Sequence, residues 1–350
     1  MIEHTTEVRD AHRFDEAALS RYLHDHAPEI RLPVEVRQFK GGQSNPTYLL
    51  IDADATALVL RKKPPGPILP SAHQVDREFR VMRALAGTGV AVPRMHVLCD
   101  DPDVIGTAFF VMDAIPGRVF RNPALPDVAT GDRRPIYLAM AGTLAALHAV
   151  DWRAVGLEGY GKTADYFGRQ VGRWAGQIEK SRTEDMPALE SLVEWLKANV
   201  PPDEPATIVH GDYRLENLVF ADTGPSVLAV LDWELSTLGH PMADLAYNCL
   251  PFHLPSRLKG LGGIADLDLN ALGIPGEREY VDAYCARAGR APVANWKFYL
   301  AFSLFRTAAI LQGVYARALQ NNASSADAFE VGGNAGEVAE IGLAIALGEG

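Results

Sequence analysis

The most constraining feature of this chain is a set of short apolar segments with polar residues at their ends. Short strands are expected at 206–209, 217–220 and 227–231. Asp212, Asn217 and Asp232 lie at or just beyond the ends of these segments, where we expect their side chains to converge on one cleft. Two carboxylates and one amide suit the binding of Mg²⁺ beside a nucleotide and the acceptance of a hydroxyl proton. The segment therefore predicts phosphoryl transfer.

The length and composition fit a globular protein with two lobes. A chain of 350 residues with 48% hydrophobic and 22% charged residues can bury two sizeable cores. The net charge of -11 argues against a nucleic-acid partner, because a phosphate backbone requires a basic surface. The only tight basic cluster covers residues 61–63.

The sequence also predicts a cellular location. Its three cysteines are Cys99, Cys249 and Cys285. They are far apart and lack metal-site spacing, as is typical of reduced, buried thiols. The N-terminus lacks the pattern of a signal peptide, and the apolar stretch 300–319 contains Arg306 and Gln312, which indicates a buried helix rather than a membrane span. We expect a cytoplasmic protein with no membrane partner.

Residues 1–112 have the pattern of a small, sheet-rich lobe. After a helix at 14–27, alternating hydrophobicity predicts strands at 34–39, 47–51, 57–61, 90–93 and 107–112. A second helix is expected after the Pro-rich segment 64–70, with Ser71 as its N-cap. Its apolar positions are Val75, Phe79, Met82 and Leu85, at spacings of three and four residues.

The remainder of the chain has a helical pattern. Helices are expected at 134–150, 166–180 and 188–199 and again within 276–346. We therefore divide the chain into a nucleotide-binding N-lobe (1–112), a hinge (113–117) and a helical C-lobe with the catalytic loop (118–350). The expected fold class is α+β.

Three motifs in this order resemble the aminoglycoside phosphotransferase family of the protein-kinase-like group. They are HGDYRLEN at 210–217, LDWE at 231–234 and GHPMADLA at 239–246. The resemblance extends over residues 35–320, and the ordered set is far more specific than HGD alone. It implies a bilobal protein-kinase-like fold, with a five-stranded antiparallel N-lobe carrying one main helix and a larger, mostly helical C-lobe.

The resemblance implies roles for the polar cluster. Asp212 would orient the acceptor hydroxyl and take its proton, and Asn217 and Asp232 would hold Mg²⁺ against the phosphates of ATP. Arg214 would either touch the γ-phosphate or face solvent.

Four further residues receive supporting or substrate roles. His210 would order the catalytic loop, and Asp244 would brace it from the following helix. Glu234 would lie near a second metal position or be a solvated acid. Arg306, in an apolar helix, requires an anion, which is either an internal acid or a carboxylate of the substrate.

The nucleotide site is expected in the N-lobe. Gly41 and Gly42 would let the backbone approach the phosphates, and Ser44 and Asn45 would donate to them.

A departure from the family pattern occurs in the third strand of the N-lobe. Arg61 stands where related kinases have Lys, with Lys62 as the alternative if the register shifts by one residue, and Glu78 is the expected ion-pair partner. The hinge backbone near Met112 and Ala114 would meet the adenine.

The acceptor is the least specified part of the interpretation. Residues 58–66 and 69–73 resemble the kinase-like domain that is joined to certain acyl-CoA dehydrogenases, which implies a hydroxyacyl compound or its CoA ester. A dehydrogenase partner would then be a separate polypeptide.

Other acceptors and functions stay open. The acidic balance would suit a cationic aminoglycoside or a choline-type substrate, although residues 306–350 lack a dense acidic cluster. A non-catalytic, nucleotide-binding pseudokinase is the alternative from a different class. A protein kinase is disfavoured, because 235–243 is too short for a peptide-docking loop.

Overall fold

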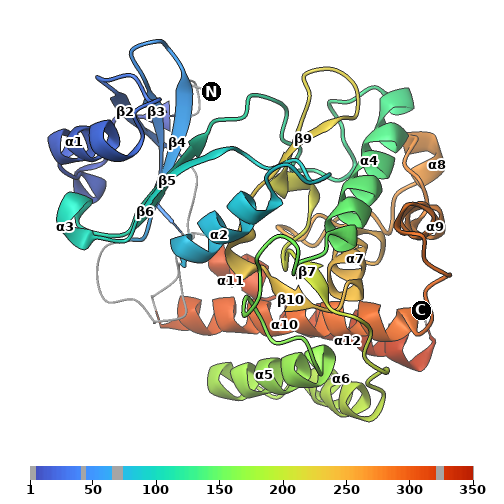
Figure 1. The fold of residues 1–350 in the computed structure, drawn as a ribbon. Helices are drawn as coiled ribbons and strands as arrows, with labels where there is room; N and C mark the ends of the chain where they lie inside the picture. The colour runs from blue at the N-terminus through green and yellow to red at the C-terminus, as the bar shows by residue number, and fades with distance from the viewer. Residues whose placement is uncertain (1–4, 41–44, 65–73, 321–326, 350) are drawn as a thin grey trace. The chain divides into compact units, whose positions relative to one another are not determined.

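The chain divides into two compact units. The structure is a computed structural model and describes residues 5–40, 45–64, 74–320 and 327–349 (Figure 1). The first unit comprises Met1–Arg118 with Leu228–Ser236, and the second comprises Val119–Val227 with Thr237–Gly350. The segment 228–236, which the sequence interpretation had included in the C-lobe, thus belongs to the first unit by its contacts.

The first unit is built on one antiparallel sheet in the order β1-β2-β3-β4-β6-β5. Its strands are β1 (Thr5–Thr6), β2 (Glu35–Phe39), β3 (Thr47–Ile51), β4 (Ala57–Lys62), β5 (Met95–Cys99) and β6 (Phe109–Asp113). The prediction of five strands was wrong by one. The additional strand β1 is only two residues long, too short to produce an alternating pattern, and it is defined by its pairing with β2.

The two faces of this sheet bury different helices. Helix α1 (Glu16–His26) contributes Leu19 and Leu23 to a core that also contains Leu58 and Leu60 of β4. Helix α2 (Val75–Leu85) packs against β5 and β6, and its Phe79 ring lies 6.3 Å from that of Phe110. Because side chains alternate along β4, its odd-numbered positions lie on the opposite face from Leu58 and Leu60.

Strand β5 starts later in the chain than the sequence pattern predicts. The strand predicted at 90–93 was wrong, because β5 starts only at Met95, after Pro93. Proline has no N–H for a ladder bond, which favours a strand start beyond it. The four-residue helix α3 (Pro102–Ile105) was not expected. Ser71, the predicted N-cap, lies outside the described residues, and α2 begins at Val75.

The second unit is mostly helical. Its helices are α4 (Thr130–Ala149), α5 (Tyr166–Ser181), α6 (Pro187–Ala198), α7 (Met242–Asn248), α8 (Leu269–Leu272), α9 (Glu277–Ala288), α10 (Trp296–Leu319), α11 (Ala328–Gly332) and α12 (Ala335–Leu347). Helix α10 packs against α5, α6, α7 and α12 and is buried along most of its length. Within the described residues, none of the helices is both long and apolar enough to span a bilayer.

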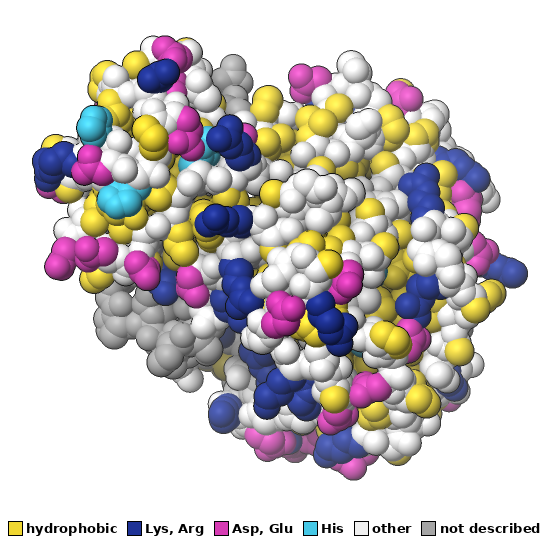
Figure 2. All heavy atoms as spheres, viewed as in Figure 1, with side chains coloured by type: hydrophobic (Ala, Val, Ile, Leu, Met, Phe, Trp, Pro, Cys, Tyr) yellow, Lys and Arg dark blue, Asp and Glu magenta, His cyan; other side chains and the backbone are white. Residues whose placement is uncertain are grey.

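Short strands carry the loops of the second unit. Strand β7 (Thr207–Val209) pairs antiparallel with β10 (Thr237–Gly239), which was not predicted. Strand β8 (Leu218–Phe220) follows the HGDYRLEN motif, whereas β9 (Val227–Val230) lies almost entirely in the segment that belongs to the first unit. Figure 2 shows acidic and basic side chains interspersed with apolar ones over the face in view.

Candidate active site

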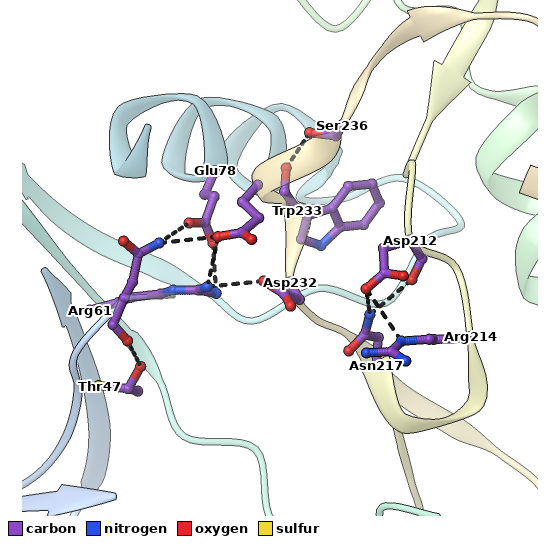
Figure 3. A network of polar contacts seen from close by, with 11 residues as sticks. Thr47, Arg61, Glu78, Asp212, Arg214, Asn217, Asp232, Trp233 and Ser236 are labelled. Carbon is purple, nitrogen blue, oxygen red and sulfur yellow. Dashed lines mark hydrogen bonds and ion pairs between the residues drawn. The ribbon is translucent and has the colours of Figure 1, made fainter. Parts of the chain in front are cut away.

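Arg61 on β4 is the centre of the polar cluster in the first unit (Figure 3). Its Nη1 lies 2.9 Å from Oε2 of Glu78, which is the expected ion pair. Its Nη2 lies 2.9 Å from Oδ1 of Asp232 and 3.5 Å from Oε2 of Glu234. Lys62 instead lies over the rings of Phe14 and Tyr48. The register of β4 therefore directs the side chain of Arg61, and not that of Lys62, toward these carboxylates.

One guanidinium serves three carboxylates in this cluster. Burial acts to lower the pKa of Arg61, but Glu78, Asp232 and Glu234 together raise it above its ordinary value. Burial raises the pKa of Glu78 to about 8, although Arg61 opposes this rise. Asn45 Nδ2 donates to Glu78 (3.3 Å) and to Glu234 (3.4 Å). Three acidic side chains thus surround one guanidinium, and their oxygens are of the kind that bind a hard cation.

Asp232 has an unusual backbone. Its φ of 66° lies in the left-handed region, which costs a residue with a Cβ about 1 kcal/mol or more. The next residue, Trp233, is fully buried, and its Nε1 donates to Val230 O at 2.9 Å. The buried indole fixes the turn, and the carboxylate of Asp232 remains 35% exposed.

The other residues expected at a nucleotide site are only partly described. Gly41, Gly42 and Ser44 lie outside the described residues. Met112 is a buried residue of β6, while the N–H of Ala114 donates to Ala57 O at 3.2 Å. The adenine contact expected at this hinge stays a prediction.

Asp212 is the centre of a second polar cluster, in the second unit. Its Oδ2 accepts from Asn217 Nδ2 at 2.9 Å and lies 3.3 Å from Arg214 Nε (Figure 3). Its Oδ1 accepts from the hydroxyl of Tyr247 at 2.8 Å. Asn217 Nδ2 also donates to the backbone O of Asp212 at 2.8 Å. Arg214 forms a further ion pair with Glu216.

Asp244 braces the loop that carries Asp212. This buried residue of α7 accepts from the N–H of His210 at 2.6 Å and from that of Gly211 at 2.8 Å. Its Oδ2 also lies 3.3 Å from Nε2 of His148. Burial acts to raise the pKa of Asp244, but the hydrogen bond and charge of His148 and the backbone N–H donors hold it below its ordinary value. A φ of 84° at Gly211 makes glycine the favoured residue there.

Arg306, on helix α10, contacts the catalytic loop. Its Nη2 donates to Gly211 O at 2.6 Å. Its guanidinium also lies over two rings, 5.1 Å from that of Tyr247 and 5.8 Å from that of Trp174. The sequence left two partners open for this buried charge, an internal acid or a carboxylate of the substrate. In the structure, a backbone oxygen and two aromatic rings contact the guanidinium. The role of Arg306 toward a substrate carboxylate stays a prediction.

Sequence reasoning missed two residues that hold the same loop. Tyr247 binds Asp212, and Asn248 Nδ2 donates to Tyr213 O at 3.1 Å. They stand three and four residues after Asp244 on α7, and such positions share one face of a helix. Because Asp244 was already expected to brace the loop, its spacing to Tyr247 and Asn248 could have indicated that they also contact the loop.

A cavity lies next to this loop within the second unit. Its volume is about 550 Å³, and Arg214 and Tyr247, both in contact with Asp212, form part of its wall. The apolar lining includes Leu250, Leu254, Leu258 and Leu261. Cationic lining comes from Arg121 and Lys259 as well as Arg214, whereas Glu216 is the acid in the wall. The cavity is large enough for a small organic molecule.

The sequence pattern of the phosphotransferase enzyme family matches residues 35–300. The chain belongs to this family. The resemblance stated from the motifs is confirmed, and so is the assignment to small-molecule phosphotransferases.

Curated relatives include acyl-CoA dehydrogenase family members. Member 10 of Mus musculus is 47% identical over 100% of this chain and 33% of its own length. Member 11 of Homo sapiens is 42% identical over 96% of this chain and 44% of its own length. This phosphotransferase chain therefore spans less than half of each of these relatives.

Solved structures of phosphotransferases have the same fold. A protein of Ralstonia eutropha JMP134, assigned to the aminoglycoside phosphotransferases, is 46% identical with a TM-score of 0.89, over 96% of this chain and 99% of its own. The hygromycin B complex of aminoglycoside phosphotransferase APH(4)-Ia with AMP-PNP is 13% identical with a TM-score of 0.61, over 94% of this chain and 98% of its own. The expected α+β, protein-kinase-like fold class is confirmed.

Proposed function

We propose that this protein transfers the γ-phosphoryl group of ATP, with Mg²⁺, to a hydroxyl group of a small molecule. The observation that carries the proposal is the environment of Asp212. Its carboxylate is held by Asn217, Arg214 and Tyr247, and the last two line a cavity of about 550 Å³. A fixed carboxylate beside such a cavity is what orienting an acceptor hydroxyl requires.

The reaction forms a bond between the acceptor oxygen and the γ-phosphorus and breaks the bond from that phosphorus to the β–γ bridging oxygen. ADP leaves, and the hydroxyl proton passes to Asp212 and from there to solvent. Because the transition state is loose, positioning and charge neutralisation contribute more than covalent assistance.

Mg²⁺ would be held by Asn217 and Asp232. Asn217 Nδ2 donates to the backbone O and to Oδ2 of Asp212. These two hydrogen bonds fix the orientation of the amide, so its carbonyl oxygen is the atom left for a metal. Asp232 offers a partly exposed carboxylate that shares Arg61 with Glu234. Such oxygen ligands suit this cation, which supplies charge neutralisation at the phosphates when bound.

The nucleotide would be bound mainly by the first unit. Arg61, oriented by Glu78, would grip phosphate oxygens through two N–H groups, and Asn45, Gly41, Gly42 and Ser44 would donate to others. Glu234 would serve as a second acid close to the metal, since it shares Arg61 with Asp232.

The acceptor that fits the cavity best is a molecule with an apolar part. Leucine side chains line this cavity, and of its basic residues Arg214 pairs with Asp212 and Glu216 and Lys259 pairs with Glu330. The names of the curated relatives point in the same direction, so we propose a hydroxyacyl compound or its CoA ester. An acyl-CoA dehydrogenase would then act as a separate partner.

The test is ADP release with a panel of acceptors. The panel contains 3- and 4-hydroxy acids, their CoA esters, choline and kanamycin, each with MgATP. We expect turnover of hydroxyacyl compounds, and Asp212→Ala should abolish it while MgATP binding persists. Asp222→Ala, at an exposed acid of the turn after β8, is the matched control and should retain full activity.

Each outcome bears on a different part of the proposal. Turnover of kanamycin alone would replace the acceptor class but keep the reaction. MgATP binding without turnover of any acceptor would favour the pseudokinase alternative, and undiminished activity of Asp212→Ala would refute the role of Asp212.

We also infer a cytoplasmic location without nucleic-acid partners. Cys99, Cys249 and Cys285 are free and buried, as expected in a reducing compartment. The net charge of -11 disfavours binding to a phosphate backbone.

A further inference from the structure

The two oxygens of the Asp212 carboxylate have different partners. Oδ2 faces Asn217 Nδ2 and Arg214 Nε, both of which come from the same loop as Asp212. Oδ1 accepts from the hydroxyl of Tyr247, which comes from α7. The Tyr247 hydrogen bond is thus a contact to this carboxylate from a separate element of the fold. It fixes the rotation of the carboxylate about its Cβ–Cγ bond.

Tyr247 is itself held rigidly at the cavity. Its ring lies 5.1 Å from the guanidinium of Arg306, which also binds Gly211 O. Burial, together with the negative charge of Asp212, raises the pKa of the Tyr247 hydroxyl, so the phenol stays protonated and remains a donor. The same residue lines the cavity proposed for the acceptor. A donor of fixed position therefore adjoins both the carboxylate and the space for the reacting alcohol.

We propose that Tyr247 is a positioning residue for phosphoryl transfer, which aims Oδ1 of Asp212 at the acceptor hydroxyl. This inference rests on the proposed function. The phenol O–H occupies one lone pair of Oδ1 and leaves the other for the O–H of the acceptor. The acceptor oxygen bonds to the γ-phosphorus, ADP departs, and the acceptor proton passes to Oδ1. Tyr247 keeps its own proton throughout.

Positioning by Tyr247 predicts a particular kinetic signature. Phe lacks the one atom that touches Asp212 but keeps the ring under Arg306, so Tyr247→Phe should leave binding of both substrates in place. We expect kcat to fall about 10- to 100-fold while the KM values for ATP and acceptor stay within about twofold. A merely structural role would instead lower the melting temperature and weaken MgATP binding.

The experiment compares wild type, Tyr247→Phe and Tyr22→Phe in the acceptor panel, with calorimetric MgATP binding and thermal melting of each protein. Tyr22 on α1 is a matched control, because its hydroxyl donates to the backbone O of Leu98. Wild type without transfer to any acceptor would overturn the proposed function and this inference together. An active wild type whose Tyr247→Phe variant matches Tyr22→Phe in kcat would overturn the inference alone. So would a Tyr247→Phe variant whose loss of activity follows a loss of stability or MgATP binding.

Discussion

The bracing of the catalytic loop by Asp244 leads to a quantitative prediction for Asp244→Asn. The carboxylate accepts two short hydrogen bonds, from His210 N–H (2.6 Å) and Gly211 N–H (2.8 Å), and is almost completely buried. Asparagine has nearly the same shape but only one acceptor oxygen. Its NH₂ group would therefore face one of the two backbone N–H donors.

The expected loss of stability follows from these contacts. A hydrogen bond to a charged group contributes about 1.5 to 3 kcal/mol, and leaving a buried donor unsatisfied costs about 1 to 3 kcal/mol. One bond is lost, the other is weakened by the loss of charge, and one N–H loses its partner. We expect the free energy of unfolding to fall by about 3 to 5 kcal/mol. This is large but less than the total stability of most folded proteins.

Urea unfolding followed by circular dichroism measures this loss. Asp266→Asn is the matched control, since Asp266 also accepts a backbone N–H, from Ser256 at 2.7 Å, but is exposed to solvent. We expect the control to change stability far less. Equal effects of the two substitutions would refute the bracing role, as would a loss in Asp244→Asn below about 1 kcal/mol.

The pH dependence supplies a second check on Asp244. Its folded-state pKa is lowered, so its contribution is fully present above the unfolded value of about 3.9 and is lost only as pH falls below that value. The carboxylate of Asp244 therefore stays ionised between about pH 6 and pH 8 and adds no pH dependence of its own to the difference in stability between wild type and Asp244→Asn.

The remaining predictions concern three other residues. Asp232→Asn should raise the Mg²⁺ concentration needed for half-maximal nucleotide binding at least about tenfold, and an unchanged Mg²⁺ titration would contradict its role as a ligand. Arg61→Lys should raise the KM for ATP about tenfold, because one ammonium group cannot replace the contacts that two guanidinium nitrogens make to Glu78 and Asp232. The dependence of the initial rate on ATP concentration measures the change in KM. Burial lowers the pKa of His240 to about 4, so its contribution to stability is full above the unfolded value near 6.5 and declines as pH falls toward 4. Urea unfolding should show about 2 kcal/mol lost from this group between pH 7 and pH 5, and His240→Gln should remove that part of the slope.

The sequence was sufficient for features that depend on local pattern. The alternation at 57–61 predicted β4 and placed Arg61 on one face of the sheet, where it meets Glu78. The spacing of apolar residues predicted α2, and its positions Val75, Phe79, Met82 and Leu85 are buried as expected.

Other features depend on contacts between distant parts of the chain and leave little local signal. Strand β10 is three residues long and is defined by its pairing with β7. The bond from Arg306 to Gly211 joins residues 95 positions apart. The hydrogen bond from the Tyr247 hydroxyl to Asp212 likewise depends on how α7 packs on the loop. Secondary-structure propensity and hydrophobic periodicity do not encode this packing.

The membership of Leu228–Ser236 in the first unit has a consequence for synthesis on the ribosome. Residues up to 118 emerge well before this segment, so the nascent first unit contains Arg61 without Asp232 or Glu234, its later partners. At ordinary translation rates the delay is on the order of 10 s. During this interval Glu78 is the one carboxylate partner of Arg61 that has already been synthesised. The first unit is thus completed only after residues 119–227 of the second unit have been made, which couples the maturation of the two units in time.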